Sequence, residues 1–176
     1  MKVLILNGSH RASGNTWRFS RFAEEVLKEQ NHVVKIIDLE ASNVKLCCGC
    51  LTCEESGKCI FDDDFSEKIV PAIEEADLII FASPVYFDMP TTLMKNFIDR
   101  SNSLCGYFAE NKKQVACFLV GQADEGSLSF AYECYKEYFM IMDLPIAGEP
   151  IMRIARDPEE LVLDEQLKEE ILKWVK

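Results

Sequence analysis

Short apolar runs alternate along the chain with longer segments in which apolar and polar residues recur at helical spacing. Runs of this kind are typical of strands buried on both faces of a parallel sheet. They predict strands at 3–6, 33–37, 78–82 and 115–120, with a fifth strand inside 145–154. The amphipathic segments predict helices near 19–30, 65–75, 91–100, 127–142 and 158–176, the last with Pro158 in its first turn.

Strands that alternate with helices predict an α/β fold with a doubly wound parallel sheet. For five strands the simplest order is 2-1-3-4-5, with helices on both faces. The whole chain, 1–176, is expected to form one domain. Residues 39–63 show no pattern of either element, so a cysteine-rich insertion is expected at about 39–64. A stretch that long without regular structure is usually functional or disordered.

Charge and hydropathy narrow the class of protein. The formal net charge of −11 argues against a nucleic-acid-binding surface, which needs a basic stripe. No apolar run approaches the length needed to span a bilayer, and no signal peptide is visible at the N terminus. We therefore expect a cytoplasmic protein without nucleic-acid or membrane partners. In that compartment clustered cysteines point to metal or redox chemistry more often than to disulfides.

Five of the eight cysteines lie between Cys47 and Cys59, four of them with the spacing C-x2-C-x2-C-x5-C. Four thiolates on a short loop suit an iron–sulfur cluster. Structural zinc sites usually use two separated C-x2-C pairs, and a redox dithiol needs only one pair. The spacing favours a cluster but leaves zinc and metal-free thiols open. The remaining thiols adjoin apolar residues and are expected to be inert packing residues: Cys105, Cys117 and Cys134.

The loop after the first strand is a candidate anion site. It leads directly into a helix, whose N-terminal N–H groups and dipole attract anions. Polar side chains and one charge add further donors: Ser9, Arg11, Ser13, Asn15 and Thr16. The loop lacks the patterns of P-loop NTPases and of dinucleotide sites, so it best fits a mononucleotide phosphate. The alternative is that these residues only turn the chain and cap the helix.

Two further segments carry candidate chemistry. The loop 83–90 follows the third strand and offers Tyr86, Phe87 and backbone N–H donors to a flat ring such as a flavin. The alternative is that the two aromatic residues are an ordinary buried pair at the end of the strand. Asp63 or Asp64 is expected to cap the helix that begins near Phe65, with the rest of this acidic run solvated.

Together these segments resemble the iron–sulfur flavoprotein family, within the NADPH-dependent FMN reductase branch of flavodoxin-like proteins. The resemblance covers essentially the whole chain. It rests on Gly8–Thr16, on the cysteine motif through Asp63, on Ser83–Phe87 and on Lys95–Arg100. Three features depart from the family pattern: His10 stands where Pro is frequent, Cys48 adds a thiol that could compete with Cys47, and the loop 121–126 is short and acidic.

The resemblance implies FMN and a [4Fe–4S] cluster. The FMN phosphate would lie on Ser9, Arg11, Ser13, Asn15 and Thr16, and the ring against Pro84, Val85, Tyr86 and Phe87, with Asp88 and Gly121 near its edge. The cluster ligands would be Cys47, Cys50, Cys53 and Cys59. The resemblance also implies ferredoxin or NAD(P)H as electron donor and a homodimer or homotetramer.

These features predict an FMN-dependent electron-transfer oxidoreductase that couples FMN to a [4Fe–4S] cluster. No catalytic side chain is expected, because the cofactors carry the chemistry. Two other functions remain open. One is an NAD(P)H-dependent FMN or quinone reductase without a cluster. The other is a non-enzymatic sensor in which a metal or thiol loop controls partner binding.

Overall fold

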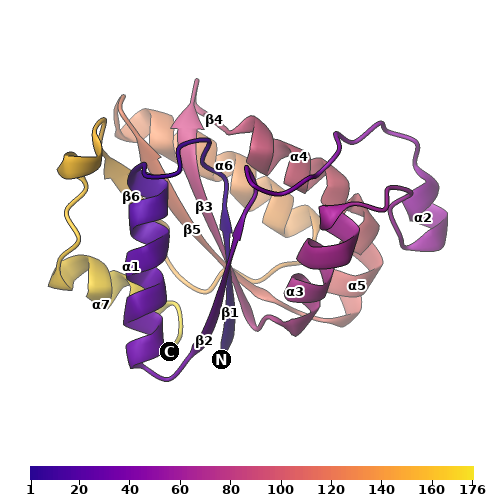
Figure 1. Cartoon of the computed structure of the whole chain (residues 1–176), viewed down its shortest axis with the longest axis horizontal. Helices are drawn as coiled ribbons and strands as arrows, with labels where there is room; N and C mark the ends of the chain where they lie inside the picture. Colours follow the sequence, from indigo (N-terminus) through magenta and orange to yellow (C-terminus); the bar gives the residue numbers. More distant parts are fainter.

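A computed structural model describes all 176 residues of the chain. Five strands form a parallel sheet in the order β2-β1-β3-β5-β6, and a short strand, β4, pairs antiparallel with the end of β3 (Figure 1). The strands are β1 (Lys2–Asn7), β2 (Val33–Asp38), β3 (Leu78–Tyr86), β4 (Met89–Pro90), β5 (Gln114–Gly121) and β6 (Ile151–Ile154). The order of the parallel strands confirms the doubly wound sheet predicted from the sequence.

Helices cover both faces of this sheet. Helices α1 and α7 pack on one face, and α3, α4 and α6 pack on the other (Figure 1). The α-helices are α1 (Asn15–Glu29), α2 (Thr52–Ser56), α3 (Val70–Glu75), α4 (Thr92–Arg100), α5 (Cys105–Glu110), α6 (Glu125–Ile141) and α7 (Glu165–Lys173). Three short helical turns accompany them: η1 (Phe65–Ile69), η2 (Ser101–Leu104) and η3 (Pro158–Glu160).

The apolar runs form strands because both faces of the sheet are covered. Successive side chains of a strand point to opposite faces, so β1 sends Val3 and Ile5 into the core under α1 and α7. Leu4 and Leu6 enter the opposite core. Full burial of each such side chain contributes about 1.5–3 kcal/mol relative to leaving it exposed.

The carboxyl ends of the parallel strands meet at one edge of the sheet. The loop after β1 is tied to β3, because the Gly8 N–H donates to the Ala82 carbonyl at 2.8 Å. The segment after β6 is tied to the end of β5 in the same way, by the Ala155 N–H and the Gly121 carbonyl at 2.8 Å. The loop after β1 and the segment after β6 are thereby each held against a neighbouring strand at this edge.

The cysteine-rich segment is not wholly irregular, and the prediction of no helix in 39–63 was wrong. The helix α2 lies within it, after Leu51 at φ 60° and before Gly57 at φ 65°. None of the residues of α2 is buried, so it has no apolar face that a sequence pattern could reveal. Hydrogen bonds to Asn96 and Asn102 hold this segment against α4 and η2.

Two further elements differ from the sequence-based expectations. The segment 83–90 was expected to be a loop, yet β3 continues to Tyr86 and turns into β4. Pro84 is tolerated there because the pairing of β3 with β1 ends at Ala82, so its missing N–H breaks no ladder on that side. The C-terminal helix begins only at Glu165, because the chain leaves the turn η3 and buries Leu161 in the core.

The short elements η2 and α5 were not predicted, because α5 buries only one residue, Phe108. The helix expected to begin at Ser127 starts at Glu125, where the Asp124 carboxylate accepts the N–H of Ser127 at 2.9 Å. None of the helices has the length and apolar character that crossing a bilayer requires.

Candidate functional site

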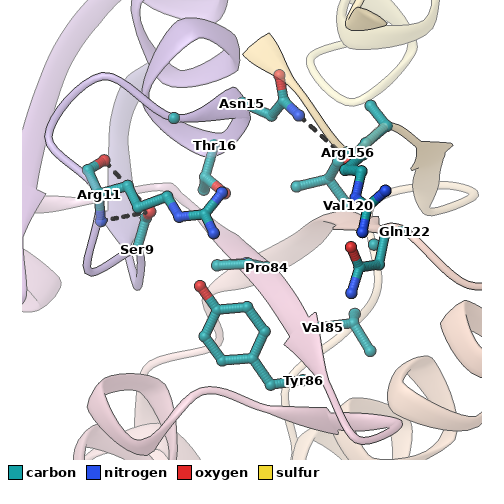
Figure 2. A pocket seen from close by; sticks show the side chains of 13 residues that line it. Ser9, Arg11, Asn15, Thr16, Pro84, Val85, Tyr86, Val120, Gln122 and Arg156 are labelled. Atoms are coloured by element: carbon teal, nitrogen blue, oxygen red, sulfur yellow. Dashed lines mark hydrogen bonds between the residues drawn. The ribbon is translucent and has the colours of Figure 1, made fainter.

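A cleft opens at the carboxyl edge of the sheet, where the loops after β1, β3, β5 and β6 meet (Figure 2). It is lined by Ser9, Arg11, Gly14, Asn15, Thr16, Pro84, Val85, Tyr86, Val120, Gly121, Gln122, Ala155 and Arg156. Open α/β sheets bind ligands in this position, beyond the carboxyl ends of the strands. Two arginines in a chain of net charge −11 make the cleft suitable for an anion.

The N terminus of α1 forms one wall of the cleft. No side chain caps this helix, so its first N–H groups have neither a helical carbonyl nor a capping side chain as acceptor. The loop and the helix lie close together here, since a Cβ added to Gly14 would come within 3.1 Å of the Arg11 Cβ. The Ser9 hydroxyl shapes the loop by accepting the Arg11 N–H at 3.1 Å. An anion at this point would receive free N–H groups and the helix dipole together.

Asn15 joins α1 to the segment after β6 and leaves one polar atom unused. Its Nδ2 donates to the Ala155 carbonyl at 3.3 Å, while its Oδ1 is buried without any partner. A buried acceptor without a partner costs free energy, so a donor from a ligand would be favoured there. The hydroxyl groups of a sugar-like chain meet that demand.

The opposite wall comes from the end of β3 and from the turn that follows it. Tyr86 lines the cleft, and its ring lies across from the Arg11 side chain (Figure 2). The turn places Phe87 and Asp88 at φ 51° and 60°, a conformation that side-chain-bearing residues rarely adopt. The Phe87 side chain is fully exposed, and the Asp88 carboxylate accepts the Ser127 hydroxyl at 2.5 Å. Strain of this kind concentrates at functional sites.

The structure brings most of the predicted cofactor-binding residues together, but not all. Ser9, Arg11, Asn15, Thr16, Pro84, Val85, Tyr86 and Gly121 line the cleft. Ser13 faces a different hollow beside Trp17, and Phe87 and Asp88 lie in the turn outside the cleft lining. The sequence reasoning missed Gln122 and Arg156. Gln122 follows a predicted strand end, which could have indicated it, whereas no pattern marks Arg156.

The cysteine segment forms a second hollow. It is lined by Cys47, Cys48, Gly49, Cys50, Leu51, Cys53, Glu54, Cys59, Ile60, Phe61, Asp99, Arg100 and Asn102. All eight cysteines of the chain are free thiols. The segment turns through Gly49 at φ 65° and Leu51 at φ 60°, and the latter is a strained position for a leucine. No three acidic, histidine or cysteine side chains come close enough together to hold a single metal ion.

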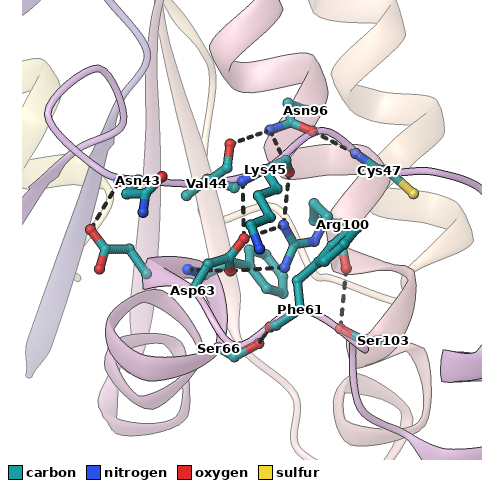
Figure 3. A network of polar contacts seen from close by, with 12 residues as sticks. Asn43, Val44, Lys45, Cys47, Phe61, Asp63, Ser66, Asn96, Arg100 and Ser103 are labelled. Atoms are coloured by element: carbon teal, nitrogen blue, oxygen red, sulfur yellow. Dashed lines mark hydrogen bonds and ion pairs between the residues drawn. The ribbon is translucent and has the colours of Figure 1, made fainter.

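A buried polar network supports this hollow (Figure 3). Arg100 donates to both carboxylate oxygens of Asp63, at 2.8 and 2.9 Å, and to the Lys45 carbonyl at 2.8 Å. The Asp63 carboxylate also accepts the N–H groups of Lys45 and Phe65. Burial would raise the pKa of Asp63, but these hydrogen bonds hold that pKa below its usual value.

Asp63 therefore both caps the helical turn at Phe65 and pairs with Arg100. The expectation that one of the acidic residues caps this helix is confirmed for Asp63. Asp62 is exposed and Asp64 is partly exposed, in line with the expectation for the rest of the run. The buried ion pair of Asp63 with Arg100 was not foreseen, because the two residues are far apart in the sequence.

Hydrogen bonds also reach the cysteines themselves. The Asn96 Oδ1 accepts the Cys47 N–H at 3.2 Å, and the Asn102 Nδ2 donates to the Cys53 Sγ at 3.4 Å. Hydrogen bonds from the backbone and hydroxyl of Thr52 lower the pKa of Cys50. A lowered thiol pKa favours the thiolate, which is the form that binds metal.

The three cysteines outside the motif differ from one another. Cys117 is buried, and burial raises the pKa of its thiol well above the usual value, as expected for an inert packing residue. Cys105 is exposed and Cys134 is partly exposed, so the packing role expected for them was wrong for Cys105. Its place after the short turn η2 puts it at the surface.

The strand order and the helices on both faces define a class of protein, those with a flavodoxin-like fold. Solved structures of that fold superpose along nearly the whole chain. The Trp repressor binding protein of Bacillus subtilis has a TM-score of 0.69 at 19% identity, covering 100% of this chain and 98% of its own. A flavone reductase has a TM-score of 0.72 at 18% identity, covering 99% of this chain and 60% of its own. At these identities the likeness shows the fold alone.

Sequence comparison then gives the family. The model of NADPH-dependent FMN reductases matches residues 1–157. An iron–sulfur flavoprotein of Methanocaldococcus jannaschii is 33% identical over 85% of this chain and 77% of its own length. Another, from Archaeoglobus fulgidus, is 36% identical over 57% of this chain and 45% of its own length. The chain belongs to the NADPH-dependent FMN reductase family, in the branch that contains the iron–sulfur flavoproteins, and is an FMN-dependent oxidoreductase.

Proposed function

We propose that this protein transfers electrons between FMN in the cleft and a [4Fe–4S] cluster held by Cys47, Cys50, Cys53 and Cys59. The observation that carries the proposal is that all four cysteines of the C-x2-C-x2-C-x5-C motif line one hollow. They are free, and a hydrogen-bond donor already reaches the sulfur of Cys53. Flavin takes up electrons in pairs and releases them singly, whereas a cluster carries one at a time, so the pair acts as a converter.

The residues of the cleft suit each part of FMN. The uncapped N terminus of α1, with Thr16 and the nearby Arg11, would hold the phosphate. The unpaired Asn15 Oδ1 would accept a hydroxyl of the ribityl chain. The ring would lie between Tyr86 and the backbone of Gly121. These residues bind and orient the flavin, and no acid or base among them needs to exchange a proton with it.

The cysteine hollow suits a four-iron cluster better than a single ion. Structural zinc sites usually take their ligands from two separated C-x2-C pairs, whereas here four thiols lie on one short segment with the spacing C-x2-C-x2-C-x5-C. In a cluster each of these thiolates would bind a different iron. Cys48 also lines the hollow and is the thiol that could replace Cys47.

Electron donors and assembly complete the proposal. Ferredoxin or NAD(P)H would supply electrons, and the protein would act in the cytoplasm as a homodimer or homotetramer. An FMN or quinone reductase without a cluster is the alternative that shares the same cleft. Rapid bleaching of the flavin by NADPH in protein that contains no iron would favour that alternative.

The substitution Cys50→Ser tests the proposal. We expect the variant to lose its iron and the broad visible absorbance of the cluster, while FMN stays bound at the wild-type ratio. Cys105→Ser is the matched control, because Cys105 is an exposed thiol outside the hollow and should keep both cofactors. A Cys50→Ser protein with full iron content would refute the assignment of the ligands.

A further inference from the structure

Arg100 is a cation buried beneath the cysteine hollow. It ends α4 and is only 2% exposed. Its guanidinium pairs with Asp63 and lies between the rings of Phe61 and Phe65, whose centres are 5.1 and 4.7 Å away. Burial of a charge costs free energy, so a buried cation is expected to have a structural or functional role.

One donor of this guanidinium remains unused. The Nη1 and Nη2 groups donate to Asp63 and to the Lys45 carbonyl, but the Arg100 Nε is buried and has no acceptor. Buried donors are nearly always paired, so an orphaned one marks a place where a partner is missing. Arg100 lines the same hollow as Cys59, and sulfur accepts hydrogen bonds.

Anchoring of the loop explains only part of this arrangement. Asp63 does that work, because its carboxylate accepts the N–H groups of Lys45 and Phe65 and the forked hydrogen bonds of Arg100. An arginine side chain stays protonated in proteins, and Arg100 lines the same hollow as Cys59. The guanidinium is therefore a permanent positive charge next to the fourth cysteine of the motif.

We infer that Arg100 raises the reduction potential of the cluster by placing its charge and its free Nε–H next to the sulfurs at Cys59. The inference rests on the proposed function, since it needs a cluster in the hollow. Reduction adds one electron to the cluster, and no bond of Arg100 forms or breaks and no proton leaves it. A nearby cation stabilises the added negative charge, and hydrogen bonds to the sulfurs act in the same direction.

Two single substitutions separate this electrostatic role from an anchoring role. Arg100→Gln removes the cation, and we expect the equilibrium constant for reduction of the cluster to fall at least tenfold, which is a shift of 59 mV for one electron. Asp63→Asn removes the compensating anion but keeps Arg100, so the potential should rise. Midpoint potentials come from a redox titration followed by electron paramagnetic resonance. If Arg100 and Asp63 only anchor the loop, both variants should lose iron, and any cluster that remains should not show midpoint potentials shifted in opposite directions.

A double variant protects the test against misfolding. Arg100→Leu with Asp63→Leu leaves no unpaired buried charge, so it should fold even if the single variants do not. FMN content checks the fold, and the potential should still fall, because Arg100 lines the hollow with Cys59 and Asp63 does not. Lys95→Gln is the control, because Lys95 is an exposed cation on α4 that does not line the hollow, and its potential should match the wild type.

The outcomes distinguish the two proposals. Wild-type protein without iron overturns the proposed function and this inference with it. Wild-type protein with a cluster, combined with an unchanged potential in Arg100→Gln and in the double variant, overturns this inference alone. Loss of iron from both of those variants while FMN remains bound leaves Arg100 a purely structural role, which also overturns it.

Discussion

The side chain of Asn96 connects α4 to the segment that enters the cysteine hollow. It accepts the Cys47 N–H at 3.2 Å and donates to the carbonyls of Val44 and Lys45 at 3.4 and 3.3 Å. A hydrogen bond contributes about 1 kcal/mol net, but these are long and partly exposed to water. We expect Asn96→Ala to lower the free energy that holds this segment closed by about 1–2 kcal/mol.

The effect of Asn96→Ala on global stability should be smaller. Alanine favours the helix more than asparagine does, by up to about 0.7 kcal/mol, which offsets part of the loss. The local effect should therefore exceed the global one. Amide hydrogen exchange of residues 44–47 should accelerate about 5–30-fold, the factor that 1–2 kcal/mol represents, while the midpoint of urea unfolding changes little.

The matched control for this prediction is Asn111→Ala. Asn111 makes a local hydrogen bond to the Tyr107 carbonyl at 3.0 Å at the end of α5, outside the cysteine segment. Its substitution should leave the exchange of residues 44–47 unchanged. The reasoning is refuted if Asn96→Ala and Asn111→Ala show the same exchange in that segment, because the side chain of Asn96 would then contribute nothing to its closure.

Three other substitutions test the sites and the ion pair. Phe87→Gly should raise the unfolding free energy by about 1 kcal/mol, because glycine adopts the backbone angle φ 51° without strain. It should also weaken FMN binding in a fluorescence titration, and an unchanged affinity would exclude Phe87 from the site. Gly121→Ala should lower the unfolding free energy by about 1 kcal/mol, since its Cβ would come within 3.1 Å of the Leu128 side chain on α6 and displace it. Gly106→Ala, with nothing within 4 Å of the added Cβ and a place in α5, should instead raise the unfolding free energy by up to about 1 kcal/mol; a loss of stability there of the same size would contradict the reasoning. Burial would raise the pKa of Asp63, but its hydrogen bonds hold that pKa below the usual value. The ionised carboxylate therefore stabilises the folded protein fully above the unfolded pKa of about 3.9, and this stabilisation is lost as the pH falls below that value. Urea unfolding should therefore show a steeper loss of stability below about pH 4 in the wild type than in Asp63→Asn, and equal slopes would contradict the ion-pair account.

The strands and the parallel sheet could be predicted because they rest on local signals, and the order 2-1-3-4-5 is the simplest one for five strands that alternate with helices. Val3–Leu6 and Leu78–Ala82 are apolar on both faces, and that composition needs a covered parallel sheet whatever the rest of the chain does. The carboxyl edge then locates the cleft without any further information. Ser9, Asn15 and Thr16 lie in the cleft for this reason.

The parts that could not be predicted depend on contacts between distant segments. Asp63 and Arg100 look like solvated surface charges in the sequence, and only the folded chain brings them together. Arg156 enters the cleft from beyond the last strand, where no turn or spacing marks it. Ser13 was assigned to the phosphate loop by its neighbours, yet the loop turns it away from the cleft, because a side-chain direction depends on backbone angles that spacing does not encode.

The coupling of FMN to a cluster is tested most directly by the composition of protein that is purified without oxygen. Iron, acid-labile sulfide and FMN should be measured on one preparation, with its visible spectrum. The account predicts about four iron and four sulfide for each FMN and each chain. Stoichiometric FMN without iron or sulfide, in protein that has never met oxygen, would contradict it and leave a flavin reductase with free thiols.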